Sequence, residues 1–233
     1  MKFINSRKIK IGNIPAILWG ELSDKMYIFV HGKMSNKESA QEFAKIAVER
    51  GYQVLSFDLP EHGERKDTNY KCNVWNGTHD LEVIGTYAQE NWTEISLFAC
   101  SLGAYFSLIA YKNLLIKKCL FQSPILDMEH LIGKMFKWFN VTEELLREKK
   151  EIFTPIDIFS WDYYCYVKEY QIDKWDIPTT IIYGTEDNLQ DRDVIDSFAN
   201  KFHSDLTISK GSEHSFHTKE QSQAVTQWLR KYI

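Results

Sequence analysis

Short apolar runs alternate with segments of helical periodicity along most of this 233-residue chain. The apolar runs lie at 26–30, 52–57, 95–100, 118–122, 178–183 and 205–209, and the helical segments at 38–50, 78–90, 102–113, 191–201 and 218–232. Strands that alternate with helices pair mostly in parallel, because each connecting helix carries the chain back across the sheet. The pattern predicts an α/β protein, a three-layer α/β/α sandwich around a mostly parallel, twisted sheet.

The N-terminal segment differs from this pattern. Residues 8–11 alternate between polar and apolar, Asn13-Ile14-Pro15 interrupts them, and the apolar residues 16–19 follow. Alternation of this kind is typical of a strand with one solvated face. We therefore predict an antiparallel pair of strands at one edge of the sheet.

A second departure is the stretch 123–177, which spans 55 residues (177 − 123 + 1) between two predicted strands. A plain crossover between parallel strands needs only about a dozen residues. The stretch is rich in aromatic residues: Phe136, Trp138, Phe139, Phe153, Phe159, Trp161, Tyr163, Tyr164, Tyr166 and Tyr170. We predict a single domain over 1–233, with 123–177 inserted in it as a small helical lid whose aromatic residues pack on the domain. The charged segment 143–151 is predicted to be a solvated helix.

Composition excludes several classes of protein. Lys and Arg total 28 and Asp and Glu total 32, and a net charge of −4 gives no general attraction to nucleic acid or to an anionic membrane. We expect no signal peptide and no membrane span, because no apolar run is long enough. The cysteines, at 72, 100, 119 and 165, form no CxxC pair, which argues against a zinc site and favours a reduced, cytoplasmic protein. The sequence does not determine the oligomeric state.

One junction between a strand and a helix carries a candidate nucleophile. The strand 95–99 runs into Cys100-Ser101-Leu102-Gly103 and then directly into a helix, which is the setting of a nucleophile elbow. Small residues, Ala99 and Gly103, lie two positions before and after Ser101 and allow a sharp turn. The competing interpretation is that Ser101 only caps the helix. Cys100 could itself be a nucleophile, but its place at the end of a strand favours a buried structural role.

The A-C-S-L-G segment, with His31-Gly32 and two later turns, resembles the α/β-hydrolase family over nearly the whole chain. Ala99 stands where the family motif G-x-S-x-G has its first glycine. The resemblance implies the α/β-hydrolase fold and a triad in the chain order Ser, acid, His. Ser101 is then the nucleophile.

The resemblance also assigns the partners of Ser101. The turn Gly184-Thr185-Glu186-Asp187 resembles the family's G-x-x-D and makes Asp187 the acid, with Glu186 and Asp127 as alternatives. The segment from Gly211 to Phe216 resembles the setting of the family's base, which makes His214 the base and leaves His217 in reserve. A serine hydroxyl needs such a base, and the base needs an orienting carboxylate.

Two backbone amides are expected to form an oxyanion hole. One belongs to Leu102, the residue after the nucleophile, and the other to Lys33, which follows His31-Gly32 in a segment that resembles the family's H-G-x motif. Met34 is the alternative donor. The Lys33 side chain could also attract an anionic substrate; the competing interpretation is a solvated surface lysine.

No cofactor and no metal are implied. The segment from Asp58 to Gly63 resembles the family's D-x-P-x-H-G loop, which shapes the end of the sheet. A metal site built from Asp58, Glu61, His62 and Glu64 is the alternative, but this spacing follows no recognised metal motif.

These features predict a serine hydrolase, foremost a carboxylic-ester hydrolase that acts on a small-molecule ester-like substrate through an acyl-enzyme. The aromatic residues of the lid could line an apolar acyl or aromatic pocket. Thioesterase, lipase, peptidase and C–C bond hydrolase activities remain open, since the fold does not choose among them. A binding protein without activity is a further alternative, against which the complete set Ser101, Asp187 and His214 speaks.

Overall fold

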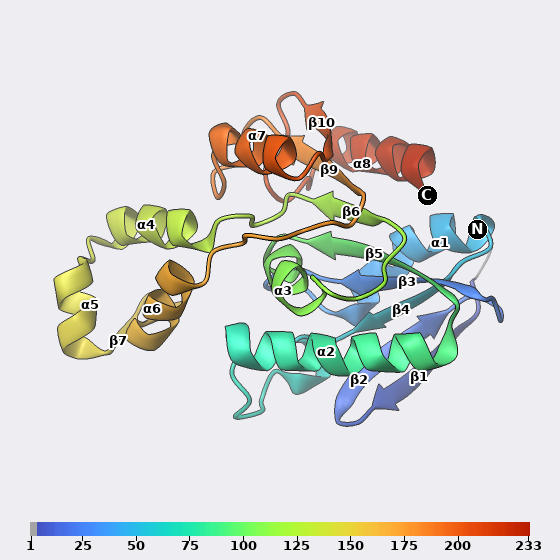
Figure 1. Ribbon diagram of the computed structural model, residues 1–233, viewed down its shortest axis with the longest axis horizontal. Helices are drawn as coiled ribbons and strands as arrows, with labels where there is room; N and C mark the ends of the chain where they lie inside the picture. The colour runs from blue at the N-terminus through green and yellow to red at the C-terminus, as the bar shows by residue number, and fades with distance from the viewer. Residues whose placement is uncertain (1–3) are drawn as a thin grey trace.

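The computed structural model describes residues 4–233, and its centre is an eight-stranded sheet (Figure 1). In the order in which they lie side by side, the strands are β1 (Ser6–Ile11), β2 (Ile14–Trp19), β4 (Gln53–Phe57), β3 (Lys25–Val30), β5 (Glu94–Cys100), β6 (Cys119–Gln122), β9 (Thr179–Gly184) and β10 (Asp205–Ser209). The predicted antiparallel pair is confirmed, because β1 lies at the edge and pairs antiparallel with β2. The strands from β4 to β10 are all parallel, and β2, β4 and β9 are buried along their whole length.

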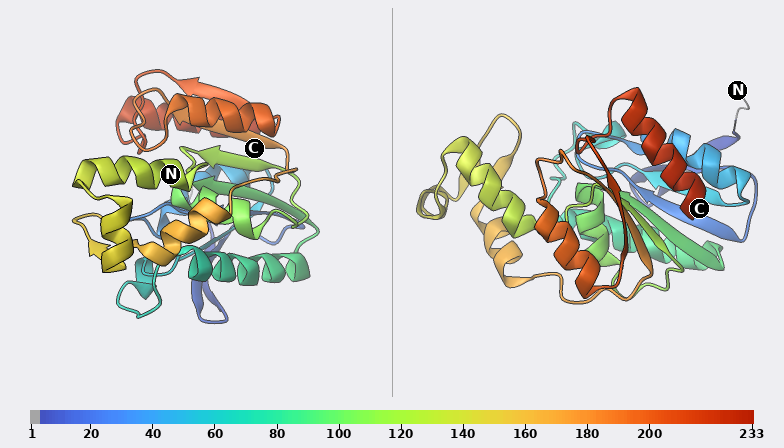
Figure 2. Two further views of the ribbon diagram at one scale, coloured as in Figure 1. Left: turned by 60° about the vertical axis from the view of Figure 1, so that its left-hand side comes forward. Right: turned by 90° about the horizontal axis from the view of Figure 1, so that it is seen from above.

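Helices cover both faces of this sheet, as Figure 2 shows. A short 3₁₀ helix (Lys37–Ala40), α1 (Gln41–Glu49) and α8 (Lys219–Tyr232) pack on one face, against Tyr27, Phe98 and Leu120. The opposite face is covered by α2 (Val74–Asn91), α3 (Leu102–Ala110) and α7 (Arg192–Lys201). The three-layer α/β/α architecture predicted from the alternation of strands and helices is thus confirmed.

Helix caps explain why some helices begin where they do. The α2 helix starts at Val74, four residues before its predicted start at 78, because the Asn73 side chain accepts the Asn76 N–H. At α8, Thr218 and Gln221 form a reciprocal capping box. Each such cap satisfies backbone groups that the first turn of a helix leaves unpaired.

The segment between β6 and β9 contains α4 (Met128–Phe139), α5 (Glu143–Lys149), β7 (Glu151–Phe153), β8 (Ile158–Ser160) and α6 (Trp161–Glu169). Figure 1 shows these helices beside the sheet, beyond its end, rather than on either face. The β7–β8 hairpin was not predicted, because strands of three residues are too short to show a period. Aromatic pairs, such as Phe136 with Phe159 and Tyr164, hold the segment together.

The Trp75 side chain, on α2, connects this segment to the sheet domain through contacts with Tyr163 and Tyr166 of α6. Across residues 4–233, none of the helices combines the length and the apolar character that crossing a membrane requires.

Candidate active site

Ser101 occupies a strained turn between β5 and α3. Its backbone has φ 51° and ψ −121°, a conformation that residues other than glycine seldom adopt. The turn also brings Gly103 against β3: a Cβ atom on Gly103 would lie 2.4 Å from the His31 carbonyl oxygen. A glycine is therefore required at 103, whereas Ala99 fits with its methyl group fully buried.

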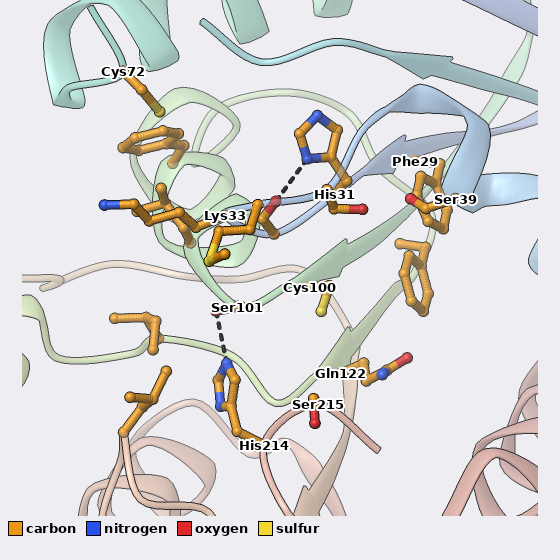
Figure 3. Close-up of a pocket in the computed structure, with 18 of the residues that line it drawn as sticks. Phe29, His31, Lys33, Ser39, Cys72, Cys100, Ser101, Gln122, His214 and Ser215 are labelled. Atoms are coloured by element: carbon orange, nitrogen blue, oxygen red, sulfur yellow. Dashed lines mark hydrogen bonds between the residues drawn. The ribbon is translucent and has the colours of Figure 1, made fainter. Parts of the chain in front are cut away.

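The three residues expected to act together form one hydrogen-bonded chain. His214 Nδ1 donates to Asp187 Oδ2 at 2.7 Å, which leaves Nε2 to accept a hydrogen bond. Nε2 accepts the Ser101 hydroxyl at 2.8 Å, as the dashed line between these two residues in Figure 3 marks. The other Asp187 oxygen, Oδ1, accepts the Leu189 N–H at 2.8 Å, and the Asp187 side chain is 1% exposed. A buried, oriented carboxylate behind the imidazole is the arrangement that lets a serine hydroxyl lose its proton.

The alternative acids and bases lie elsewhere. Asp127 accepts the His130 N–H at the start of α4, and Glu186 is exposed. His217 pairs with Glu213 at 3.1 Å and is also exposed. The structure therefore brings Ser101, Asp187 and His214 together. The alternative acids and the alternative base make no hydrogen bond to Ser101 or His214.

Two backbone amides, one directly after Ser101 in the chain and one in the loop that follows Gly32, make no hydrogen bond among the described residues. Within residues 4–233, neither the Lys33 N–H nor the Leu102 N–H donates a hydrogen bond to the protein. The Met34 N–H, the alternative donor, is already used by His62 Nε2 at 3.0 Å. The loop also passes close to the nucleophile, since a Cβ atom on Gly32 would lie 3.0 Å from the Ser101 Cβ.

His31 holds this loop in place. Its Nδ1 donates to the Gly32 carbonyl at 2.7 Å, and its Nε2 accepts the Leu59 N–H at 3.1 Å. Burial is the main reason that the pKa of His31 is lowered to about 4. A neutral imidazole suits both hydrogen bonds, because one nitrogen must donate and the other must accept.

Two further residues support the site and carry no sequence signal. The Ser123 hydroxyl donates to the His214 carbonyl at 2.7 Å. The fully buried Gln190 accepts the backbone N–H groups of Leu126 and Asp127 at 2.9 and 2.8 Å. Together they tie the loops that carry His214 and Asp187 to the chain that leaves β6. Only the folded chain brings these positions together, since 123 and 190 lie far from their partners in sequence.

Cys100 is unsuited to act as a nucleophile. Burial raises the pKa of its thiol to about 12, and the negative charge of Asp187 acts in the same direction. The nucleophilic form of cysteine is the thiolate. A thiol that stays protonated therefore leaves Ser101 as the only reactive group at the elbow.

The loop after β4 is an ion-pair network. Lys37 Nζ lies 2.7 Å from Asp58 Oδ2, and both side chains are buried. The same Asp58 oxygen accepts the Glu64 N–H at 2.9 Å, and Arg65 donates to the Asp58 carbonyl at 3.0 Å. Across the part of the chain that the structure describes, no three His, Cys, Asp or Glu side chains are grouped to hold a metal ion.

A cavity of about 1700 Å³ opens at Ser101 and extends under the 123–177 segment. Apolar side chains line that part of it, among them Met128, Ile132 and Phe159. At its rim Lys33 forms an ion pair with Asp157 of the β7–β8 turn. The hypothesis that Lys33 attracts a substrate anion is weakened, because such an anion would have to displace the Asp157 carboxylate.

No protein-family model matches the sequence, and no curated protein sequence matches it either. Several solved structures, in contrast, align with this one over most of their length. Est1E from Butyrivibrio proteoclasticus with ferulic acid bound aligns over 97% of both chains at 16% identity, with a TM-score of 0.77. An esterase from Pyrococcus furiosus aligns over 98% of this chain and 92% of that one, at 17% identity and a TM-score of 0.68. Alpha/beta hydrolase domain-containing protein 10 from mouse aligns over 97% of both chains, at 15% identity and a TM-score of 0.73.

The chain has the α/β-hydrolase fold. At 15–17% identity, similarity to these three structures establishes the fold only. Proteins with this fold catalyse many different reactions. The reaction of this chain has to be argued from its own site.

Proposed function

We propose that the protein is a serine hydrolase that cleaves carboxylic esters through a covalent acyl-enzyme. The observation that carries the proposal is the hydrogen-bonded chain from Ser101 Oγ through His214 to Asp187, with distances of 2.8 and 2.7 Å. As Oγ attacks the ester carbonyl, His214 Nε2 takes its proton, and the Asp187 carboxylate stabilises the charged imidazole. The proton then passes to the leaving oxygen, and water releases the acyl group in a second round.

The unpartnered amides of Lys33 and Leu102 support the same proposal. Attack on the carbonyl places negative charge on its oxygen, and donors that already point at this position stabilise the charge without rearranging. Removal of one such donor typically lowers kcat by about 10²–10³-fold. The neutral His31 would fix the Lys33 amide in place, since it holds the carbonyl of Gly32 directly before it.

We further propose that residues 123–177 act as a lid that binds the acyl group of the substrate. Apolar and aromatic side chains from this segment line the cavity beside Ser101. The ferulic acid bound by Est1E is an aromatic acid, and an apolar or aromatic acyl group would suit the lining described here. Phe153 and Ile158, at the rim, are exposed and would be covered by such a substrate.

The test replaces the nucleophile. We expect Ser101→Ala to lower kcat for p-nitrophenyl butyrate by at least about 10⁴-fold, because the variant has no group to form the acyl-enzyme. Its thermal unfolding should match that of the wild type. A fluorophosphonate probe should label the wild type and not the variant. Retained activity in Ser101→Ala, or an unlabelled wild type, would refute the proposal; the second result would favour a binding protein.

A further inference from the structure

The lining of the cavity at Ser101 also includes residues outside the 123–177 segment, and we call the part of the cavity that they line the second arm. Figure 3 shows Cys100, Gln122, Ser215 and Ser39 on one side of Ser101, and Lys33 and Cys72 on the other. The second arm lies between the sheet and the layer of α1 and α8, whose residues Phe43 and Val225 also line it. The cavity therefore continues past the nucleophile in two directions.

Strand periodicity places a polar group where this face of the sheet is otherwise apolar. Phe98 on β5 and Leu120 on β6 belong to the core beneath α1 and α8. Side chains repeat on one face every second residue, so Cys100 and Gln122 continue the same face. They are also partners in the β5–β6 register. Gln122 thus ends an apolar stripe at the edge where the active site begins.

The Gln122 side chain is half-buried, and its amide makes no hydrogen bond to any residue from 4 to 233. A half-buried amide that makes no hydrogen bond within the protein is free to bind a polar group from outside it. Its backbone is fixed relative to the nucleophile, because the Gln122 carbonyl accepts the Ser101 N–H at 3.2 Å. An amide held at this place is ready to bind a polar group of a substrate.

The reaction geometry indicates which part of the substrate enters this arm. His214 Nε2 must give its proton to the leaving oxygen, and Ser215, the next residue, lines the second arm. The apolar arm under α4 suits the acyl group, which leaves the second arm for the alcohol. The Ser39 hydroxyl already donates to the Asn36 carbonyl at 2.7 Å, and the Ser215 hydroxyl lies 3.2 Å from His217 Nδ1. The charged side chains from α1 and α8 in the lining pair with one another, Lys45 with Glu42 and Arg230 with Glu49. The uncharged Gln122 amide is therefore the group that suits a neutral hydroxyl better than a charged alcohol.

We propose that the second arm is the leaving-group site and that Gln122 determines specificity for esters of polyhydroxy alcohols, such as glycerol or a sugar. This inference rests on the proposed esterase function. In acylation the bond from Ser101 Oγ to the carbonyl carbon forms and the bond to the alcohol oxygen breaks. The serine proton leaves with the alcohol by way of His214. Gln122 touches the alcohol only, through a second hydroxyl that takes no part in bond breaking.

The experiment compares two esters with one acyl group, 1-monobutyrin and propyl butyrate. Wild type should have the larger kcat/KM for monobutyrin. Gln122→Leu should lower the ratio of the two kcat/KM values by about 5- to 10-fold, the effect of one lost hydrogen bond. Gln122→Glu, which keeps an acceptor, should retain more of the ratio than Gln122→Leu. Tyr163→Phe removes a buried hydroxyl from a residue beside the other arm and should change the ratio by less than about twofold.

Each contrary outcome has a distinct meaning. An unchanged ratio in Gln122→Leu, or an equal loss on both esters, would overturn the specificity role of Gln122. A second pair of esters, p-nitrophenyl butyrate and p-nitrophenyl 3-hydroxybutyrate, differs only by a hydroxyl on the acyl group. If Gln122→Leu lowers kcat/KM selectively for the 3-hydroxybutyrate ester, the second arm binds the acyl group, and its assignment as the leaving-group site is wrong. If the wild type hydrolyses none of these esters, the esterase proposal itself fails, and the Gln122 variants are not needed to show it.

Discussion

The sheet domain and the 123–177 segment hold their side chains in place by different means. In the sheet domain, Asp187 and Asp58 are buried and each of them accepts several hydrogen bonds. In the 123–177 segment the Glu143–Lys168 ion pair is exposed, and the aromatic side chains Phe136, Phe159, Trp161 and Tyr164 pack on one another. Buried pairs fix a geometry, whereas exposed pairs contribute little to stability. In our proposal the first region supplies the catalytic groups, and the second binds the acyl group of the substrate.

The largest expected effect comes from the acid of the sheet domain. Asp187→Asn should lower kcat for p-nitrophenyl butyrate by about 10⁴-fold, because an amide in place of the carboxylate favours the wrong tautomer of His214. The matched control is Asp127→Asn, at the start of α4 in the other region, where the side chain only caps a helix. We expect this control to change kcat less than about threefold. A comparable loss in both variants would contradict the assignment of Asp187 as the acid.

The next effect concerns the stability of the two regions. Lys37→Met leaves the Asp58 carboxylate buried without its cation and should lower the free energy of unfolding by about 3–5 kcal/mol. Lys168→Met removes an exposed lysine from α6 and should cost at most about 1 kcal/mol. Urea unfolding followed by circular dichroism measures both. Similar losses in the two variants would show that the regions do not differ as described.

A third effect links the oxyanion loop to pH. The pKa of His31 is lowered to about 4 in the folded protein from an ordinary value of 6.5, so the unfolded chain binds the extra proton between these values. Stability from this residue is therefore complete above about pH 6.5 and is lost as the pH falls towards 4, by about 3 kcal/mol in total.

The measurement is urea unfolding at several pH values between 7 and 4.5. Wild type should lose stability steadily over this range. His31→Asn is expected to be less stable at pH 7 but to show a shallower slope, because it lacks the titrating group. An unchanged slope in His31→Asn would mean that His31 is not the source of the pH dependence.

The smallest effect is expected where the two regions meet at the rim of the cavity. Lys33 and Asp157 are both well exposed, so Lys33→Ala and Asp157→Ala should each cost less than about 1 kcal/mol, with a coupling energy of a few tenths in the double variant. Lys33→Ala keeps the backbone amide and should leave the ratio of KM values for acidic and neutral esters within about twofold. A marked rise in KM for acidic esters alone would revive the hypothesis that Lys33 attracts a substrate anion.

Much of the sheet domain could be predicted because its strands, helices and elbow leave patterns in residues that are close together in the sequence. Continuous apolar runs mark strands buried on both faces, and the alternating residues 8–11 mark the edge strand β1. A serine between a strand and a helix, with Gly103 two residues later, shows the elbow before any fold is known. The structure of the 123–177 segment was harder to predict. The strands of its hairpin are too short to show an alternating pattern, and its aromatic residues can pack in many ways.

The sequence by itself determined the fold class and the residue types at the candidate site, since both follow from local patterns and chain order. Only the tertiary structure decided which donors and acceptors meet. It paired the Met34 N–H with His62, gave the Lys33 amide no acceptor among residues 4–233, and paired the Lys33 ammonium with Asp157. It also placed Gln122 at the end of an apolar stripe beside Ser101. Contacts between residues far apart in the chain depend on how strands and loops come together, and no local pattern records that.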